Sequence, residues 1–271
     1  MMDEHANPEE EIAFPEEFQE ELVSLPLPAA PTQPQKKLVF AKHPPIVSYT
    51  ILGITVLVYL LQMGSEILLG YDLVAMYGMK SNIMITAGEY WRLITPILLH
   101  ANMLHIGFNM YGLYLYGPEM ERVMGHWQFL ALYLVSGFTG VAASFALTDA
   151  NSLGASTSVV GLLAAFGMMA YLNQEAFGEN ARRVVQGVLR IGFINLLIGL
   201  SSPGIDNWGH LGGLLGGVMI IWVGGPVFKV RETDSEVHIE NQRGNMQFVL
   251  GLGLTLLVFG AITVVKMLLG N

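Results

Sequence analysis

Long apolar runs separated by short polar breaks dominate the pattern of this chain. A helix needs about 20 apolar residues to cross the hydrocarbon core of a bilayer, with roughly 17–25 acceptable. Seven windows reach that length, some with interruptions, and they predict an all-α fold, a polytopic bundle of membrane helices. The windows lie at about residues 45–63, 101–117, 127–147, 156–173, 185–202, 208–226 and 246–268.

Basic residues predict the orientation of this bundle, because cytoplasmic segments of membrane proteins are enriched in Lys and Arg. Three lysines precede the first window: Lys36, Lys37 and Lys42. The N-terminus is therefore expected in the cytoplasm. Six further basic residues fall in the loops expected on that side, at 118–126, 174–184 and 227–245. The loops expected outside hold Lys80 and Arg92 alone. No organelle-targeting signal is recognisable, so the plasma membrane is the expected location.

Composition agrees with a membrane protein and locates the excess charge. Of 271 residues, 52% are hydrophobic and 13% charged, with a mean hydropathy of +0.49. The absence of cysteine excludes disulfides, thiolate metal sites and a cysteine nucleophile. The net charge of −9 arises in residues 1–35, which contain nine acidic residues, six prolines and no Lys or Arg. Residues 1–43 are therefore expected to be a disordered cytosolic tail, although their few apolar residues leave a docking motif open.

The segment 64–98 is too long for a simple connection between the first two windows. It contains amphipathic pieces and the group Tyr90-Trp91-Arg92. Aromatic and basic side chains favour the boundary between membrane and water. This external loop is expected to lie in the interface as short helices, with Trp91 and Arg92 as loop anchors.

Polar residues from three distant windows are expected at one depth of the bilayer. Ser156 lies at the outer end of the fourth window, and His210 lies about one turn into the sixth. His105 and Asn109 lie in the outer half of the second window. Strongly polar groups at such depth are costly and usually functional, and they face the bundle interior.

The chemistry of these side chains suggests acyl transfer. A serine hydroxyl becomes a good nucleophile when a base such as imidazole removes its proton. His105 and Asn109, at i and i+4, project from one helix face and could donate to a developing oxyanion together with the Ser156 N–H. If the helix extends back to His100, this residue lies about 180° from Asn109 and cannot share its face, so it is assigned a structural role in holding the long loop.

Glycines predict close packing between the fourth and sixth windows. Gly209, Gly213 and Gly217 recur every four residues, and Gly161 with Ala165 offers a matching pair. Small residues at this spacing let two membrane helices approach closely, as a Ser–His hydrogen bond between helices requires. Taken alone, the glycines would favour tight packing without catalysis.

The chain resembles the rhomboid family of intramembrane serine proteases over roughly residues 45–226. Five motifs in the family's order form the resemblance: Trp91-Arg92, His100-Ala101-xxx-His105-xxx-Asn109, Glu121-xxx-Gly125, Gly154-Ala155-Ser156 and His210-Leu-Gly-Gly. The resemblance implies a six-helix catalytic core at 44–226, a cytosolic linker at 227–245 and a seventh transmembrane helix at 246–271. It also implies a serine endopeptidase without cofactor or metal that cuts transmembrane segments of other proteins.

The resemblance also implies roles for individual residues. Ser156 would be the nucleophile and His210 the general base of a dyad without a third acidic member. His105 and Asn109 would stabilise the oxyanion, whereas His100, Trp91, Arg92, Gly154 and Gly213 would support the site. Two positions depart from the family pattern. Thr157 replaces a glycine of the usual Gly-x-Ser-Gly, and Val160 stands where an aromatic ring often stacks on the catalytic histidine.

Two alternatives to a protease remain from the sequence. A catalytically weak or inactive rhomboid-like protein could bind transmembrane helices, and Thr157 is the feature that favours it. A transporter would show internal repeats and discontinuous spans, and no persuasive repeat is present. No metal-ligand spacing or phosphate-binding glycine loop is recognisable, and neither a nucleic-acid partner nor an oligomeric state is indicated.

Overall fold

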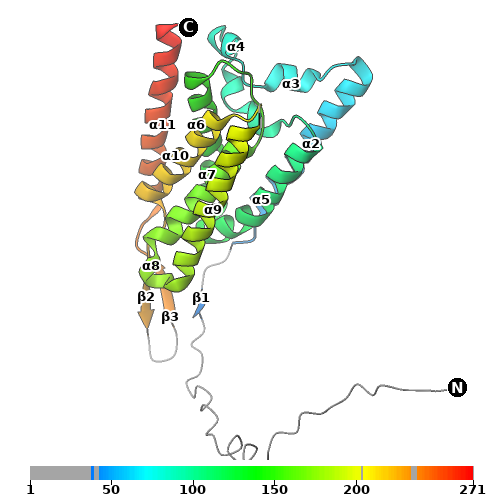
Figure 1. Ribbon diagram of the computed structural model, residues 1–271. Coiled ribbons are helices and arrows are strands. Elements are labelled where there is room, and N and C mark those ends of the chain that lie inside the picture. The colour runs from blue at the N-terminus through cyan, green and yellow to red at the C-terminus, as the bar shows by residue number, and fades with distance from the viewer. Residues whose placement is uncertain (1–37, 40–42, 203, 233–236, 271) are drawn as a thin grey trace, which may run out of the picture. The chain divides into compact units, whose positions relative to one another are not determined.

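The computed structural model describes residues 38–39, 43–202, 204–232 and 237–270. The expected tail at 1–43, apart from positions 38, 39 and 43, lies outside the described residues, as do Lys36, Lys37 and Lys42. Helices dominate the described part (Figure 1). Seven of them have 17 to 25 residues and fall one in each predicted window: α2 Ile46–Leu69, α5 Met103–Met124, α6 His126–Leu147, α7 Ser156–Leu172, α9 Glu179–Ser201, α10 Asn207–Gly224 and α11 Asn245–Leu269.

Four of these helices are long and apolar enough to cross a membrane by themselves, namely α2, α6, α9 and α11. The shorter helix α7 is also apolar. The predicted all-α membrane bundle, with six core helices and one further C-terminal helix, is therefore confirmed, and the protein is an integral membrane protein.

The loop predicted at 118–126 is wrong, because α5 continues through Pro118 to Met124. Gly125, with a φ of 89°, then separates α5 from α6 in a single residue. The polar residues that suggested a loop are used within the fold. The fully buried carboxylate of Glu121 accepts hydrogen bonds from the backbone N–H groups of Val47 and Ser48, at 2.8 and 2.7 Å, and so caps the start of α2.

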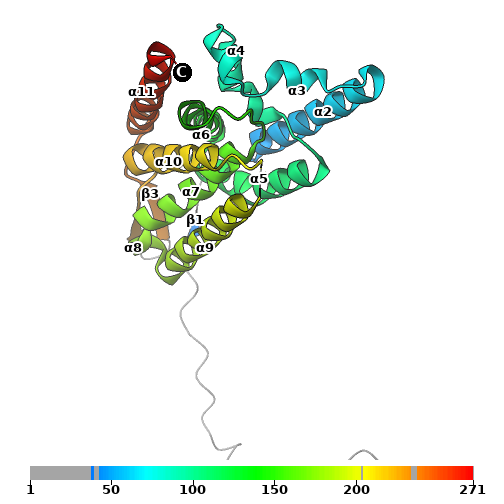
Figure 2. The same cartoon turned by 45° about the horizontal axis from the view of Figure 1, so that its top comes forward.

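Helix α10 packs against α6, α7 and α11 (Figure 2). Its glycines face other backbones directly. A Cβ on Gly213 would overlap the carbonyl of Thr157, and a Cβ on Gly217 would overlap that of Gly161. The small residues that the sequence placed on these two helices therefore lie at their contact. Close approach of this kind stabilises helix pairs where there is no water to drive association.

The long segment between α2 and α5 folds into four short helices. These are α3 Leu73–Gly78, α4 Asn82–Thr86, η1 Tyr90–Leu93 and η2 Thr95–Leu98. Helices α3 and α4 lie at the top of Figure 1. The segment begins later than predicted, because α2 extends to Leu69 and ends at Gly70, whose φ is 81°.

A small sheet occupies the opposite end of the bundle, next to the single turn α8 Gln174–Phe177 (Figure 1). Strands β2 Phe228–Glu232 and β3 Val237–Asn241 form an antiparallel hairpin in the expected linker between α10 and α11. Strand β1 Leu38–Val39 pairs in parallel with β3. The buried side chain of Asn173, at the end of α7, accepts a hydrogen bond from the Phe228 N–H at 2.6 Å and so fixes the start of the hairpin.

Candidate active site

Ser156 is the first residue of α7, and the chain before it is held from two directions. The Gly154 N–H donates to the Pro96 carbonyl at 2.9 Å, and the Ala155 N–H donates to Nε2 of His100 at 3.4 Å. The first N–H groups of a helix have no intrahelical partner. In the described part of the chain the Ser156 N–H has no acceptor, so it is a free donor beside its own hydroxyl.

Gly154 lies at the point where His105 and Ser156 converge. A Cβ built on Gly154 would lie 2.7 Å from Nε2 of His105 and 3.5 Å from Oγ of Ser156. The φ of Gly154 is 141°, a conformation that L side chains rarely adopt. Glycine is therefore required here both for the backbone turn and for the close approach of the imidazole.

His105 presents Nε2 to this point in the correct form for a donor. Its Nδ1 accepts a hydrogen bond from the Ala101 N–H at 3.5 Å, which leaves the proton of the neutral ring on Nε2. Asn102 fixes the start of α5 by accepting the His105 N–H at 2.9 Å. These contacts with Ala101 and Asn102 at the start of α5 thus direct the imidazole N–H of His105 toward the Ser156 end of α7.

Asn109 lies one turn further along α5 and is 5% exposed. Its side-chain amide donates one hydrogen to the His105 carbonyl at 3.0 Å. An amide nitrogen has two hydrogens, so the second remains for another acceptor. The i, i+4 pair predicted from the sequence therefore lies on one helix, with Asn109 bonded back to His105.

His210 lies in the first turn of α10, which Asp206 caps. The carboxylate of Asp206 accepts the Gly209 N–H at 2.8 Å, and its backbone carbonyl accepts the His210 N–H. A Cβ on Gly209 would contact the side-chain methyl of Thr157 at 3.2 Å. His210 and Ser156 thus each adjoin a residue of the same tight α7–α10 contact. Within the described residues their side chains are not hydrogen-bonded to one another.

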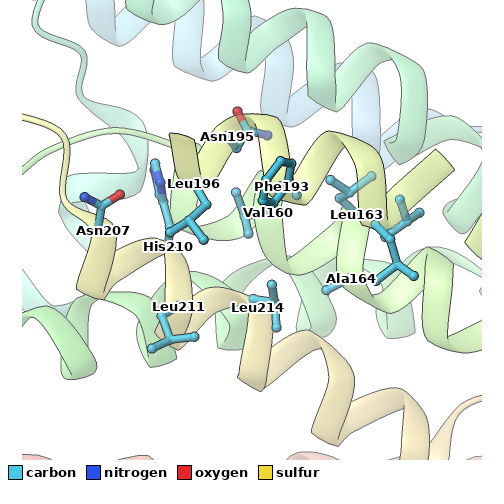
Figure 3. A pocket seen from close by; sticks show the side chains of 13 residues that line it. Val160, Leu163, Ala164, Phe193, Asn195, Leu196, Asn207, His210, Leu211 and Leu214 are labelled. Carbon is cyan, nitrogen blue, oxygen red and sulfur yellow. The ribbon is translucent and has the colours of Figure 1, made fainter. Parts of the chain in front are cut away.

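A mostly apolar pocket of about 290 Å³ opens beside His210 between α7, α9 and α10. In Figure 3, His210 and Asn207 lie toward one end of the pocket, and Leu163 and Ala164 toward the other. Val160 also lines this space. The small side chain that stands where the family often has an aromatic ring therefore borders open volume. Helix α9 forms one wall, and its buried residues are Ala181 and Gly199.

His100 supports the site from the segment before α5, which begins too late to include it. The side-chain amide of Gln62, on α2, brackets the His100 backbone by accepting its N–H at 3.0 Å and donating to its carbonyl at 3.1 Å. The His100 ring meets that of His105 edge to face at 5.1 Å. Burial, assisted by the neighbouring His105, lowers the pKa of His100 to about 3, so this ring is neutral.

Trp91 and Arg92 lie in η1 and contact the short helices rather than Ser156. The Arg92 guanidinium donates to Glu89 and to the carbonyls of Met76 and Met79, at 2.6 to 2.9 Å. The Trp91 indole N–H donates to the Tyr77 carbonyl at 3.1 Å, and the two rings stack. Both contacts fix α3 against η1.

Two supporting groups were not identified from the sequence. The Pro96 carbonyl and the Gln62 amide reach the site from other elements, and a proline carbonyl or a lone glutamine has no pattern that distinguishes it. Within the described residues, no group of three or more His, Asp or Glu side chains has the geometry to hold a metal ion.

Comparison with known proteins identifies the family of the chain. A family model described as the Rhomboid domain matches residues 87–227. The rhomboid protease GluP of Bacillus subtilis (strain 168) is 36% identical over 199 residues, which is 73% of this chain and 38% of GluP. Two Arabidopsis thaliana proteins are also similar. The chloroplastic RHOMBOID-like protein 9 is 30% identical over 59% of this chain and 37% of its own length. The mitochondrial RHOMBOID-like protein 6 is 35% identical over 49% of this chain and 43% of its own length.

The chain therefore belongs to the rhomboid family, whose proteases are intramembrane hydrolases that act on transmembrane substrates within the bilayer. The matched region contains the site residues predicted from the sequence, from Trp91 to His210, whereas Gln62 lies before it. The chain spans less than half the length of these three relatives.

Proposed function

We propose that this protein is an active rhomboid protease that cleaves transmembrane segments of membrane-anchored proteins with a Ser156–His210 dyad. The observation that carries the proposal is the convergence at Gly154. The Ser156 hydroxyl and the His105 imidazole both border one point where a side chain is excluded, next to the free N–H groups that begin α7. A serine hydroxyl beside hydrogen-bond donors is the arrangement that oxyanion stabilisation requires.

In the proposed mechanism, His210 removes the proton from Ser156 Oγ as the oxygen attacks the scissile carbonyl. The tetrahedral intermediate collapses when protonated His210 gives that proton to the leaving amine, which breaks the peptide bond. Water then attacks the resulting ester while His210 takes a proton from it. The ester bond breaks as His210 returns this proton to Ser156 Oγ, which releases the carboxylic acid product and restores the enzyme. A neutral His210 is needed at the start, and no cofactor takes part.

Three donors are assigned to the oxyanion: the Ser156 N–H, the Nε2–H of His105 and the second amide hydrogen of Asn109. Removing one such donor typically lowers kcat by about 10²–10³-fold. Asn109→Ala should therefore reduce kcat by about that factor with little change in KM, because the contact forms in the transition state. Tyr111→Ala, an exposed position on the same helix, is the matched control and should retain wild-type kcat in purified reporter assays.

A transmembrane substrate must unwind locally before Ser156 can attack it, since the carbonyls of a helix are already hydrogen-bonded and shielded. The apolar lining of the pocket between α7, α9 and α10 favours an apolar substrate side chain beside His210. The Lys and Arg distribution supports a cytosolic N-terminus, with the site near the outer surface. A plasma-membrane location rests on the missing organelle-targeting signal alone.

A second candidate function is helix binding without cleavage, since the family also contains inactive members. Thr157 is the feature that favours it. The packing of Thr157 argues for activity instead. The methyl group of Thr157 lies against Gly140 and Gly209, which have no side chains and so leave room for it. The fold thus accommodates the departure from the usual motif without displacing Ser156.

The test is cleavage of a generic transmembrane reporter in proteoliposomes that contain wild-type protein, Ser156→Ala or His210→Ala. The proposal expects cleavage by the wild type and loss of at least 10³-fold in each variant. Reporter binding that persists in a wild-type protein unable to cut would support the helix-binding function instead.

A further inference from the structure

We propose that Lys80 is a positioning residue for the proteolysis described above, holding in place the connection from α6 to Ser156. This inference rests on the proposed function and adds a residue that lies outside the five motifs of the resemblance. Lys80 follows α3 and is 0% exposed, although a lysine in a loop is normally solvated.

Lys80 binds the connection between α6 and α7 along its length. Its Nζ donates to the carbonyls of Thr148 and Ala150, at 2.7 and 2.8 Å. Its backbone forms an antiparallel bridge with Ser152, from the Lys80 N–H to the Ser152 carbonyl at 2.9 Å and in return at 3.3 Å. One residue therefore contacts three alternate positions of the eight-residue segment that leads to the nucleophile.

Further hydrogen bonds near Lys80 also hold the connection between α6 and α7. The Asn82 amide donates to the carbonyls of Phe145 and Thr148 and to the Asp149 carboxylate, at 2.8 to 3.2 Å. Beyond Ser152, the Gly154 N–H donates to Pro96. The segment between Thr148 and Gly154 is thus anchored to the loop after α2 at successive points, and Lys80 contributes the most of them.

The charge of Lys80 lies within the electrostatic influence of charged residues on other elements. Three charged groups act on it: Asp206 at the start of α10, Asp149 in the connection and Lys266 on α11. Asp206 caps α10 through Gly209, one residue before His210. The described side chains place no carboxylate in a direct ion pair with Lys80.

Losing Lys80 would leave the part-buried Ala150 carbonyl without its donor and the Thr148 carbonyl with Asn82 alone, and a carbonyl that loses its donor is costly where water cannot replace it. The connection would then shift to find water or other donors. Because Ser156 follows directly, the hydroxyl and the free N–H of α7 would move with it. An error of about 1 Å in a reacting group can lower the rate by about 10²-fold, so kcat is the quantity that should fall.

The experiment compares Lys80→Met with Glu121→Gln, which lowers stability at the opposite end of α5 without touching residues 148–155. Full-length variants in proteoliposomes are assayed for kcat and KM on the transmembrane reporter, and amide hydrogen exchange is followed across residues 148–155. We expect Lys80→Met to lower kcat at least tenfold with KM within twofold, and to accelerate exchange at Ser152 and Gly154 at least tenfold. Glu121→Gln should leave that exchange unchanged.

If Lys80→Met does not fold, Asn82→Ala replaces it, with the same direction expected for kcat and exchange. The inference is overturned if residues 148–155 of Lys80→Met exchange at the wild-type rate. It is also overturned if Lys80→Met loses no more kcat than Glu121→Gln does at an equal loss of Tm. A wild-type protein whose reporter cleavage does not depend on Ser156 overturns the proposed function instead. The exchange comparison then still decides whether Lys80 holds the connection.

Discussion

Both the backbone conformation at residue 154 and the approach of His105 to Ser156 require glycine at this position. Gly154→Ala should lower reporter cleavage by about 10²-fold or more, since a methyl group would meet the His105 ring at 2.7 Å. The positive φ adds about 1–3 kcal/mol of strain. Rates of reporter cleavage and Tm of the purified variants measure the two effects.

Gly88→Ala is the matched control for that substitution. Gly88 also has a positive φ, of 105°, but a Cβ there would meet nothing within 4 Å. It should share the loss of stability and retain cleavage within about twofold. Equal losses of cleavage in both variants would show that strain alone, and not the approach of His105 to Ser156, explains the requirement for glycine.

At the scale of elements, Glu121 joins three helices through one carboxylate. It accepts the N–H groups that begin α2, the hydroxyl of Ser48 at 2.6 Å and a hydrogen from Nδ1 of His126 at 2.6 Å. Glu121→Gln places an amide against several donors, so it should destabilise the fold by about 2–4 kcal/mol. Glu119→Gln removes an exposed ion pair with Arg122 and should cost less than about 1 kcal/mol. Unfolding in mixed detergent measures both changes.

The helices and their glycine contacts could be predicted from the sequence because each depends on local pattern. Apolar length located all seven long helices, and the four-residue spacing of Gly209, Gly213 and Gly217 predicted the α10 face that meets α7. The ends of the helices were less predictable. Pro118 and the acidic residues after it indicated a loop, yet α5 continues because Glu121 finds partners on α2, more than 70 residues away.

The candidate site shows the same division between local and distant information. His105 and Asn109 lie on one helix, so their spacing was informative. The angular argument placed His100 on the opposite face of a helix that in fact begins at Met103, and it missed the contact of His100 with the Ala155 N–H. Lys80 had no local signal, because its burial depends on carbonyls 68 and 70 residues further along the chain.

For the molecule as a whole, Lys80 predicts how stability depends on pH. Burial lowers the pKa of Lys80 from 10.5 to about 8, partly offset by Asp206 and Asp149. Between these values the unfolded chain binds a proton that the folded chain does not, so the free energy of unfolding rises with pH in that window. The rise from this residue is at most about 3 kcal/mol.

Lys80→Met removes this contribution. Between pH 8 and pH 10.5, the unfolding free energy of the wild type should therefore rise relative to that of the variant. Unfolding measured at a series of pH values in the same detergent tests this. Parallel curves for the two proteins would contradict a buried Lys80 with a lowered pKa.

The central claim is that Ser156 is a nucleophile activated by His210, and its most direct test is covalent labelling by a fluorophosphonate. Mass spectrometry of the labelled wild-type protein should locate the adduct on Ser156. The rate of labelling should fall by at least 10²-fold in His210→Ala, and the adduct should be absent in Ser156→Ala. Labelling on another residue, or wild-type labelling of Ser156 in His210→Ala, would contradict the proposed dyad.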